Sequence, residues 1–375
     1  SLIGLKKYDE AIDDIIHALD IDYDNKAFYL MQDVADSAMV PLVAKLKIQS
    51  TKNPNNDYWL YCLGVVYENK GAYKKAITYY TDCQKKNPSS ITSYRISNCY
   101  SEIGDYASAL QHIDNAIALD STDYDNVMAK ADILYESGDA KAAILELDKY
   151  VAHYPEYYGG YYRRGWYKDN SSDVDGAIED YTMAIVLQPD YAYAYLGRGD
   201  MYALKGDNKS AEADYKKVIE LDTIPSNSSC AQYAYLELGQ KEKAVEFMNN
   251  VIEKEPNDAG NYYDAACLHS RMGELDKSVE FLQTALKKGF RRFSHLEIDD
   301  DLDAIRELPK YEELIRQYKS IFETEIEDKM QATSVYEEQT VEIPFSKEDG
   351  VCKVKCAINN LPLYFVFDTG ASDVS

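Results

Sequence analysis

The sequence predicts a mostly α-helical protein, an α-solenoid in which helix pairs stack into a superhelix, followed by a short C-terminal β segment. Within residues 57–290 the apolar residues follow helical spacing on both sides of a recurring turn. After residue 340 they alternate with polar residues, which is typical of strands. Units of about 34 residues that cannot each bury an apolar face are expected to stack. The repeat itself is marked by alanines 33 or 34 positions apart, at Ala76, Ala109, Ala143, Ala177, Ala211 and Ala244.

The composition excludes several classes of partner. The chain has 375 residues, with 40 Lys and Arg against 65 Asp and Glu, so its formal net charge is −25. Such a chain repels nucleic acid and anionic membrane surfaces, so we expect neither as a partner. No apolar run approaches the roughly 18 residues of a membrane span. The 35 tyrosines, against 9 phenylalanines and 2 tryptophans, suggest amphipathic helix surfaces and grooves that receive a protein or peptide ligand.

The cysteines argue against a disulfide scaffold, because their number is odd and they lack framework spacing. Most fall inside helical patterns, where a reduced cysteine packs as a small apolar residue. This favours a reducing compartment such as the cytoplasm. The seven cysteines are Cys62, Cys83, Cys99, Cys230, Cys267, Cys352 and Cys356.

The first two segments depart from the regular repeat. Residues 1–23 match only the second half of a unit, and the chain opens in the middle of a pattern, so we expect the natural start to be missing. Residues 24–56 are expected to form a degenerate helix pair, since the turn glycine is absent and Pro41 interrupts the segment.

Seven regular repeats follow in residues 57–290, each expected to be two helices joined at glycine or a substitute. Small residues such as Gly64 and Gly199 stand where two helices must approach closely, and large ones such as Tyr80 and Tyr215 fill the spaces opposite them. A recurring proline ends the second helix. With these features, residues 1–293 resemble the tetratricopeptide repeat (TPR) family, which implies a peptide-binding groove on the concave face.

Residues 294–330 are expected to be capping helices, and the polar residues 331–340 a linker. The run from Asp299 to Asp303 could suggest a calcium loop. An EF-hand loop needs glycine at its sixth position and glutamate at its twelfth, and Ala304 and Lys310 stand there. We therefore expect no metal and no cofactor.

Residues 341–375 predict two strands, a hairpin turn and an apolar third strand that runs into the sequence D-T-G-A-S. This arrangement resembles the start of a retropepsin-like aspartic peptidase domain. The resemblance implies that Asp368 is one of two carboxylates sharing a proton, that Thr369 braces the active-site loops, and that Gly370 allows the tight turn beside the carboxylate.

Two interpretations of this tail remain open. In the first, the parent protein is an aspartic endopeptidase whose second aspartate comes from another copy, with a possible dimer through the C-terminal strands, or from further sequence. We expect the 375-residue chain itself to be a fragment of such a protein, inactive as a peptidase. In the second, the protein is a non-enzymatic TPR adaptor whose tail only resembles a peptidase.

The first helix of each repeat is expected to line the concave groove, and its residues there are aromatic or acidic. Such a groove suits a peptide with basic or apolar anchors, although each ring could equally serve packing between repeats. TPR proteins that bind the C-terminal carboxylate of a partner carry basic residues on these helices. Aspartates stand there in this sequence, so a C-terminal carboxylate is disfavoured as the ligand. The predicted groove residues are Tyr61, Tyr94, Asn98, Asp132, Tyr135, Tyr162, Trp166, Asp200 and Tyr233.

Overall fold

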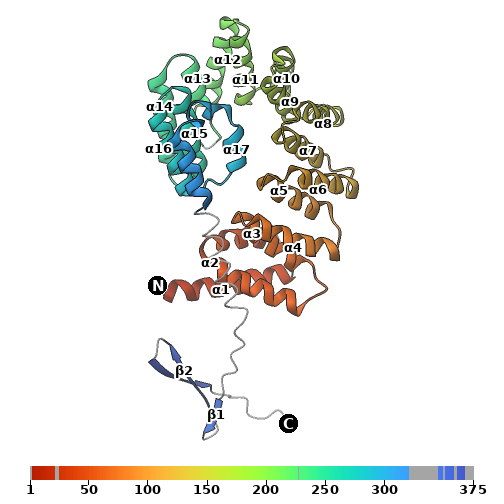
Figure 1. Ribbon diagram of the computed structural model, residues 1–375, viewed down its shortest axis with the longest axis vertical. Helices are drawn as coiled ribbons and strands as arrows, with labels where there is room; N and C mark the ends of the chain where they lie inside the picture. Colours follow the sequence, from red (N-terminus) through yellow and green to blue (C-terminus); the bar gives the residue numbers. More distant parts are fainter. Residues whose placement is uncertain are drawn as a thin grey trace. The chain divides into compact units, whose positions relative to one another are not determined.

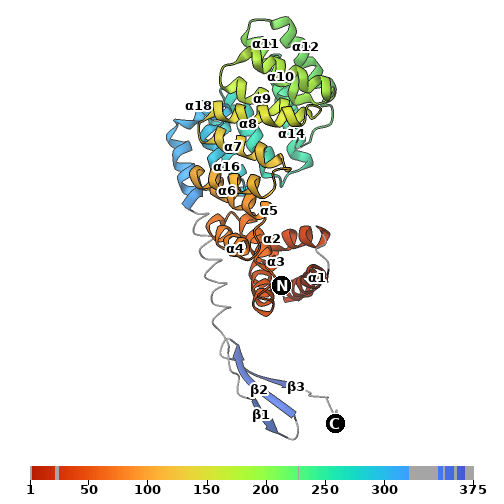
Figure 2. The same cartoon turned by 90° about the vertical axis from the view of Figure 1, so that its right-hand side faces the viewer.

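A computed structural model describes residues 2–21, 25–226, 228–320, 345–348, 351–358 and 361–367. The chain divides into two compact units, Ser1–Ile326 and Glu327–Ser375. In the first unit, helix pairs stack in sequence order, which confirms the predicted solenoid (Figure 1, Figure 2).

The N-terminal helices are α1 (Leu2–Ile21) and α2 (Asn25–Lys52). Helix α2 is interrupted at Ala38, whose φ of −146° and ψ of 47° are not helical. The break lies three residues before Pro41, which has no N–H to donate to the preceding turn. The segment therefore consists of two helical pieces on either side of a kink.

Seven regular helix pairs follow α2. Their first helices are α3 (Tyr58–Asn69), α5 (Ser90–Glu102), α7 (Asp125–Glu136), α9 (Tyr158–Asn170), α11 (Ala192–Leu204), α13 (Ala231–Glu237) and α15 (Ala259–Arg271). Their second helices are α4 (Tyr73–Lys86), α6 (Tyr106–Leu119), α8 (Ala140–His153), α10 (Val174–Leu187), α12 (Asn208–Leu221), α14 (Lys241–Lys254) and α16 (Leu275–Lys288).

Close approach inside a pair depends on glycine opposite tyrosine. A Cβ atom on Gly64 would lie 2.4 Å from the Tyr80 ring, and one on Gly199 would lie 2.7 Å from the Tyr215 ring. Both distances are far below van der Waals contact. Only glycine therefore fits at these two positions without moving the tyrosine.

Arginine contacts that recur with the repeat period, here called the arginine ladder, connect helices within a repeat and between successive repeats. Arg164, on α9, bonds Asp180 of its own repeat through Nε at 2.8 Å and Nη2 at 2.6 Å, and Asp148 of the preceding repeat at 2.7 Å. Arg198, 34 residues later on α11, repeats the bidentate contact with Asp214, at 2.8 Å through both nitrogens. The same period that positions the core thus also positions the polar contacts between repeats.

The C-terminal end of the first unit covers the last repeat. Helix α16 ends at Gly289, whose φ is 109°, and is followed by α17 (Phe293–Ile298), the 3₁₀-helix η1 (Asp300–Leu302), α18 (Asp303–Arg306) and helical residues 309–320. Apolar side chains of this region, including Leu296 and Ile305, join the core of α15 and α16. Helix α17 also contacts α7, so the C-terminal end of the first unit lies against the concave face (Figure 1).

In the second unit, β1 (Phe345–Glu348), β2 (Val351–Ile358) and β3 (Leu361–Phe367) form an antiparallel sheet in the order β1-β2-β3. Phe345 pairs with Val354, and Cys352 pairs with Phe367. The predicted linker 331–340 and the predicted catalytic residues Asp368, Thr369 and Gly370 lie outside the described residues.

Candidate functional site

The concave face of the first unit contains a cavity of about 280 Å³. The first helices of several central repeats line it on one side, and the segment from His295 to Asp301 lines it on the other. Residues of α7, α9, α11, α13 and α15 all reach the cavity, so it belongs to the superhelix and not to any single repeat.

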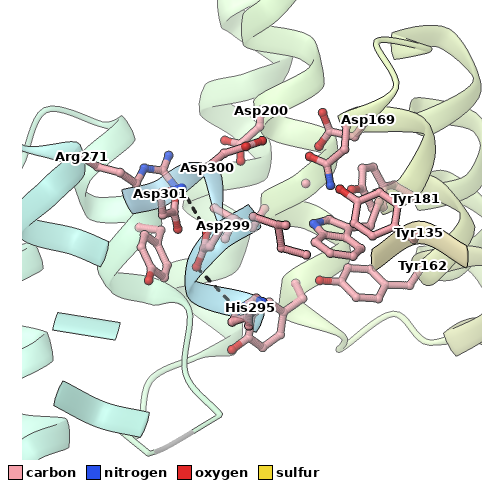
Figure 3. Close-up of a pocket in the computed structure, with 17 residues that line it drawn as sticks. Tyr135, Tyr162, Asp169, Tyr181, Asp200, Arg271, His295, Asp299, Asp300 and Asp301 are labelled. Atoms are coloured by element: carbon pink, nitrogen blue, oxygen red, sulfur yellow. Dashed lines mark hydrogen bonds and ion pairs between the residues drawn. The ribbon is translucent and has the colours of Figure 1, made fainter. Parts of the chain in front are cut away.

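One wall of the cavity is aromatic, and its rings support one another. The Tyr135 ring lies 5.0 Å from the Trp166 ring, and the Tyr162 ring lies 5.9 Å from that of Tyr181 and 6.4 Å from that of Tyr193. Tilted and edge-on contacts at such distances are favourable between aromatic rings. Figure 3 shows Tyr135, Tyr162 and Tyr181 together on one side of the cavity.

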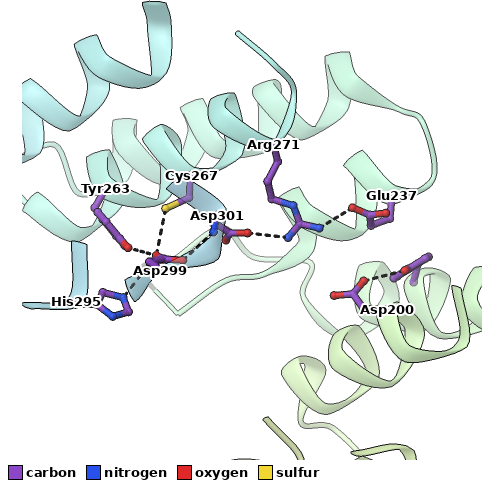
Figure 4. Close-up of polar contacts among 9 residues, drawn as sticks. Asp200, Glu237, Tyr263, Cys267, Arg271, His295, Asp299 and Asp301 are labelled. Atoms are coloured by element: carbon purple, nitrogen blue, oxygen red, sulfur yellow. Dashed lines mark hydrogen bonds and ion pairs between the residues drawn. The ribbon is translucent and has the colours of Figure 1, made fainter. Parts of the chain in front are cut away.

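The opposite wall is acidic and is held by α15. Asp299 accepts hydrogen bonds from the Tyr263 hydroxyl and, at 3.8 Å, from the Cys267 thiol (Figure 4). Asp301 pairs with Arg271 at 3.5 Å, and its backbone N–H donates to Asp299 at 3.0 Å. These contacts hold the short segment that carries the acidic side chains against the last repeat.

Arg271 is already engaged by this acidic wall. Besides Asp301, it contacts Glu237 at 2.6 Å, and its guanidinium lies 5.2 Å from the centre of the Tyr233 ring. A cation stacked on an aromatic face and paired with two carboxylates is strongly held.

Burial raises the pKa of four cavity carboxyls, Asp300 among them. The pKa of Asp169 rises to about 6, that of Asp200 to about 7 and that of Asp301 to about 6, with loss of hydration as the main cause in each. Arg271 opposes the shift at Asp200 and Asp301, while the neighbouring Asp300 adds to it at Asp169. A further positive charge in the cavity would stabilise the ionised forms of all four.

Within the described ranges no group of three or more His, Cys, Asp or Glu side chains is arranged to hold a metal ion. Nor does any helix described by the structure have the length and apolar character needed to cross a membrane. The cavity thus offers a ligand aromatic surfaces for stacking and negatively charged carboxylates.

The structure brings five of the nine predicted groove residues to the cavity: Tyr135, Tyr162, Trp166, Asp200 and Tyr233. Tyr61 is instead in ring contact with Tyr80 of its own repeat, at 5.6 Å. Tyr94, on α5, packs against buried residues of α6 and α7, and Asn98 also lies on α5, outside the cavity lining. Asp132 accepts a hydrogen bond from Tyr167 and pairs with Arg163 at 3.3 Å, so its carboxylate is already occupied.

Two features escaped the sequence analysis. Basic residues do reach this face, since Arg271 lines the cavity and Arg163 pairs with Asp132, which corrects the expectation of a groove without them. His295 and Asp299 to Asp301 also line the cavity, although the acidic run indicated only the start of a cap. The acidic run was visible in the sequence, but its position opposite α9 depends on the curvature of the superhelix.

Known families match this chain across its helix pairs. Models described as tetratricopeptide repeat match residues 60–90, 96–158, 162–226, 233–258 and 259–287, together more than half of the chain. A chloroplastic protein of Arabidopsis thaliana is 27% identical over 87 residues, which are 22% of this chain and 26% of that protein. The chain thus spans about a quarter of the length of this curated relative.

Several solved structures align with parts of this chain at low similarity. A crystal structure of MamA is 26% identical, with a TM-score of 0.40, and the match covers 44% of this chain and 92% of that one. A tetratricopeptide repeat protein from Parabacteroides merdae is 14% identical, with a TM-score of 0.46, over 70% of this chain and 98% of that one. YrrB, described as a TPR protein with an unusual peptide-binding site, is 16% identical, with a TM-score of 0.39. The match covers 48% of this chain and 92% of that one.

Proposed function

Because the chain belongs to the tetratricopeptide repeat proteins, we propose that it is an interaction scaffold that binds a protein or peptide partner on its concave face. The observation that carries this proposal is the cavity between the aromatic wall and the acidic wall. It lies where a segment running along the first helices would meet residues of five repeats.

The size of the cavity indicates how a partner would use it. Pockets that enclose whole small molecules typically measure about 300–1,000 Å³. At about 280 Å³ this cavity lies below that range, which suits a single anchoring side chain. We therefore expect the rest of the partner to lie outside the cavity, along the concave face, and the anchor to dominate affinity.

Panning a random-sequence peptide library against the full chain tests this function. Selected peptides should bind the wild type and lose at least tenfold in affinity for the Tyr162→Ala, Trp166→Ala double variant, because an aromatic anchor site contributes about 2 kcal/mol or more. The matched control is Tyr154→Ala with Tyr157→Ala, two exposed tyrosines that do not line the cavity.

The helical circular-dichroism signal separates binding from packing. It should stay at the wild-type level in both double variants. Loss of helicity together with binding would assign Tyr162 and Trp166 to packing between repeats. Peptides that bind both double variants equally well would place the interaction site elsewhere.

We also propose a second function, for the C-terminal segment, as the start of a retropepsin-like domain in which Asp368 is one half of a catalytic pair. The antiparallel order β1-β2-β3 favours it, since β3 leads directly into the D-T-G sequence. The other carboxylate would then come from a second copy of the chain or from further sequence of the parent protein. A purely adaptor function is the competing proposal, and cleavage of unfolded protein that depends on Asp368 would favour the peptidase over it.

A further inference from the structure

The cavity presents carboxylates that lack a positive partner. In the part of the chain that the structure describes, neither Asp169 nor Asp300 forms an ion pair, and Asp200 accepts its hydrogen bond from the neutral hydroxyl of Tyr215, at 2.8 Å. Arg271 is already shared between Glu237 and Asp301. The negative charge around the cavity therefore exceeds the positive charge that balances it.

The aromatic wall favours a flat cation. A guanidinium is planar, weakly hydrated and able to stack on a ring while it bonds a carboxylate in bidentate fashion, whereas an ammonium is a compact and strongly hydrated charge. This chain uses that combination itself: the Arg198 guanidinium lies 5.6 Å from the Tyr195 ring centre while two of its nitrogens bond Asp214. The cavity offers the same two elements, rings beside carboxylates, to a side chain from outside.

We propose that the cavity binds the guanidinium group of an arginine in the partner peptide. The inference rests on the proposed scaffold function and narrows it, because it names the anchor. The aromatic wall of Tyr162 and Trp166 stacks on the guanidinium plane, and Asp169 and Asp300 accept its hydrogen bonds. Charge complementarity and the single-side-chain size of the cavity carry the assignment.

Tryptophan fluorescence gives a direct test. The chain has two tryptophans, of which Trp166 lines the cavity and Trp59 is fully buried in α3. The probe is acetyl-Gly-Arg-Gly-amide, compared with the same peptide carrying citrulline, lysine or norleucine at the centre. In the Trp59→Phe variant the arginine peptide should give a saturable signal, with at least tenfold weaker binding for the neutral isostere citrulline, since a hydrogen bond between charged groups contributes about 1.5–3 kcal/mol.

Should Trp59→Phe unfold, the difference between the wild type and Trp166→Phe isolates the same signal. The inference is overturned if citrulline or norleucine binds as tightly as arginine, or if no saturation occurs up to about 10 mM. Binding of lysine as tight as that of arginine overturns the assignment of a guanidinium site.

Charge-removing variants locate the site. Asp169→Asn and Asp300→Asn should each weaken binding of the arginine peptide about tenfold. Asp276→Asn is the matched control, because its side chain is 84% exposed and lies outside the cavity. Equal affinities in all three variants would contradict the proposal.

Failure of this inference is distinguishable from failure of the scaffold function. If the selected library peptides need Trp166 for binding but contain no essential arginine, the scaffold function is supported and the arginine site is contradicted. If the arginine tripeptide binds saturably but the library yields no longer peptide that binds, the arginine site is supported and the peptide-binding groove is contradicted.

Discussion

Ser172 occupies a backbone conformation that belongs to glycine in the other repeats. Its φ is 63°, and the corresponding turn residues are Gly71, Gly104, Gly138, Gly206, Gly239 and Gly273, all with positive φ. A left-handed conformation is unfavourable for residues with a Cβ atom, by about 1–2 kcal/mol. Ser172 is thus a strained position in an otherwise uniform series of turns.

We predict that Ser172→Gly stabilises the solenoid by about 0.5–1 kcal/mol, because relief of strain exceeds the entropy that glycine loses on folding. Gly206→Ala is the reverse control, since a Cβ atom there meets nothing within 4 Å and only the backbone is strained. Thermal melting should move up for the first variant and down for the second. A lower melting temperature for Ser172→Gly would show that the serine side chain contributes to the turn.

The raised pKa values of the cavity carboxyls predict that binding of the arginine peptide strengthens between about pH 5 and about pH 8. With pKa values of about 6 and about 7, Asp169 and Asp200 ionise in this window, and only their ionised forms attract the cation. Burial lowers the pKa of His295, so this residue loses its positive charge at a lower pH than an exposed histidine does. The nearby charged and titratable groups are Asp169, Asp200, Glu237, Asp264, Arg271, His295, Asp299, Asp300 and Asp301.

Titration of the fluorescence signal at several pH values measures this dependence. Asp200→Asn should flatten it, because one of the ionising groups is removed. The stability of the free protein should move in the opposite direction. A carboxyl whose pKa is higher in the folded state contributes stability that is fully present below its unfolded pKa and is lost as pH rises through its folded pKa. Binding independent of pH would argue against cation recognition by these groups.

At the scale of helices, the arginine ladder explains how successive pairs are held in register. Arg198 on α11 bonds Asp214 on α12 and also Thr182 on α10, at 3.2 Å. Asp214 is 6% exposed, so its carboxylate depends on this partner. Each such arginine therefore connects the two helices of one repeat with the second helix of the preceding repeat.

We predict that Arg198→Met destabilises the solenoid by about 2–4 kcal/mol, because it leaves Asp214 buried and unpaired. Adding Asp214→Leu should recover part of the loss, since no charge then remains buried. Lys205→Met is the control: its ion pair with Asp175 is largely exposed, and its removal should leave the denaturation midpoint unchanged. Equal losses of stability in Arg198→Met and Lys205→Met would contradict a stabilising role of the arginine ladder.

At the scale of the whole chain, the C-terminal segment bears on whether the protein acts as an enzyme. The sequence contains one D-T-G motif, at Asp368. An aspartic peptidase needs two carboxylates that share a proton and a closing flap over the substrate. One such carboxylate per chain is present in the sequence.

We predict that the 375-residue chain does not cleave unfolded protein at acidic or neutral pH. Incubation with denatured casein, followed by gel electrophoresis, is the measurement, with Asp368→Asn as the matched variant. Cleavage that disappears in Asp368→Asn would contradict this prediction and show that two copies can assemble the catalytic pair. Absence of cleavage in both proteins is the expected result, and it agrees both with an adaptor and with an incomplete peptidase domain.

The sequence by itself determined the repeat, the helix pairs and the small-to-large packing, because these depend on neighbours within about 34 residues. Gly64 opposite Tyr80 and the turn series through Gly71 follow from spacing alone. In this part of the molecule, local physical chemistry and the final structure agree because each repeat contacts mainly the next.

Only the tertiary structure decided which of the predicted groove residues line the cavity. Asp200 and Asp301 are 101 positions apart in the sequence, and both line the cavity because the superhelix curves until α17 contacts α7. Tyr61 and Asn98 fit the same sequence pattern as Tyr162 but lie on earlier repeats, away from the cavity. Small rotations between repeats add up over the whole array, and that sum is not encoded in the pattern of any single repeat.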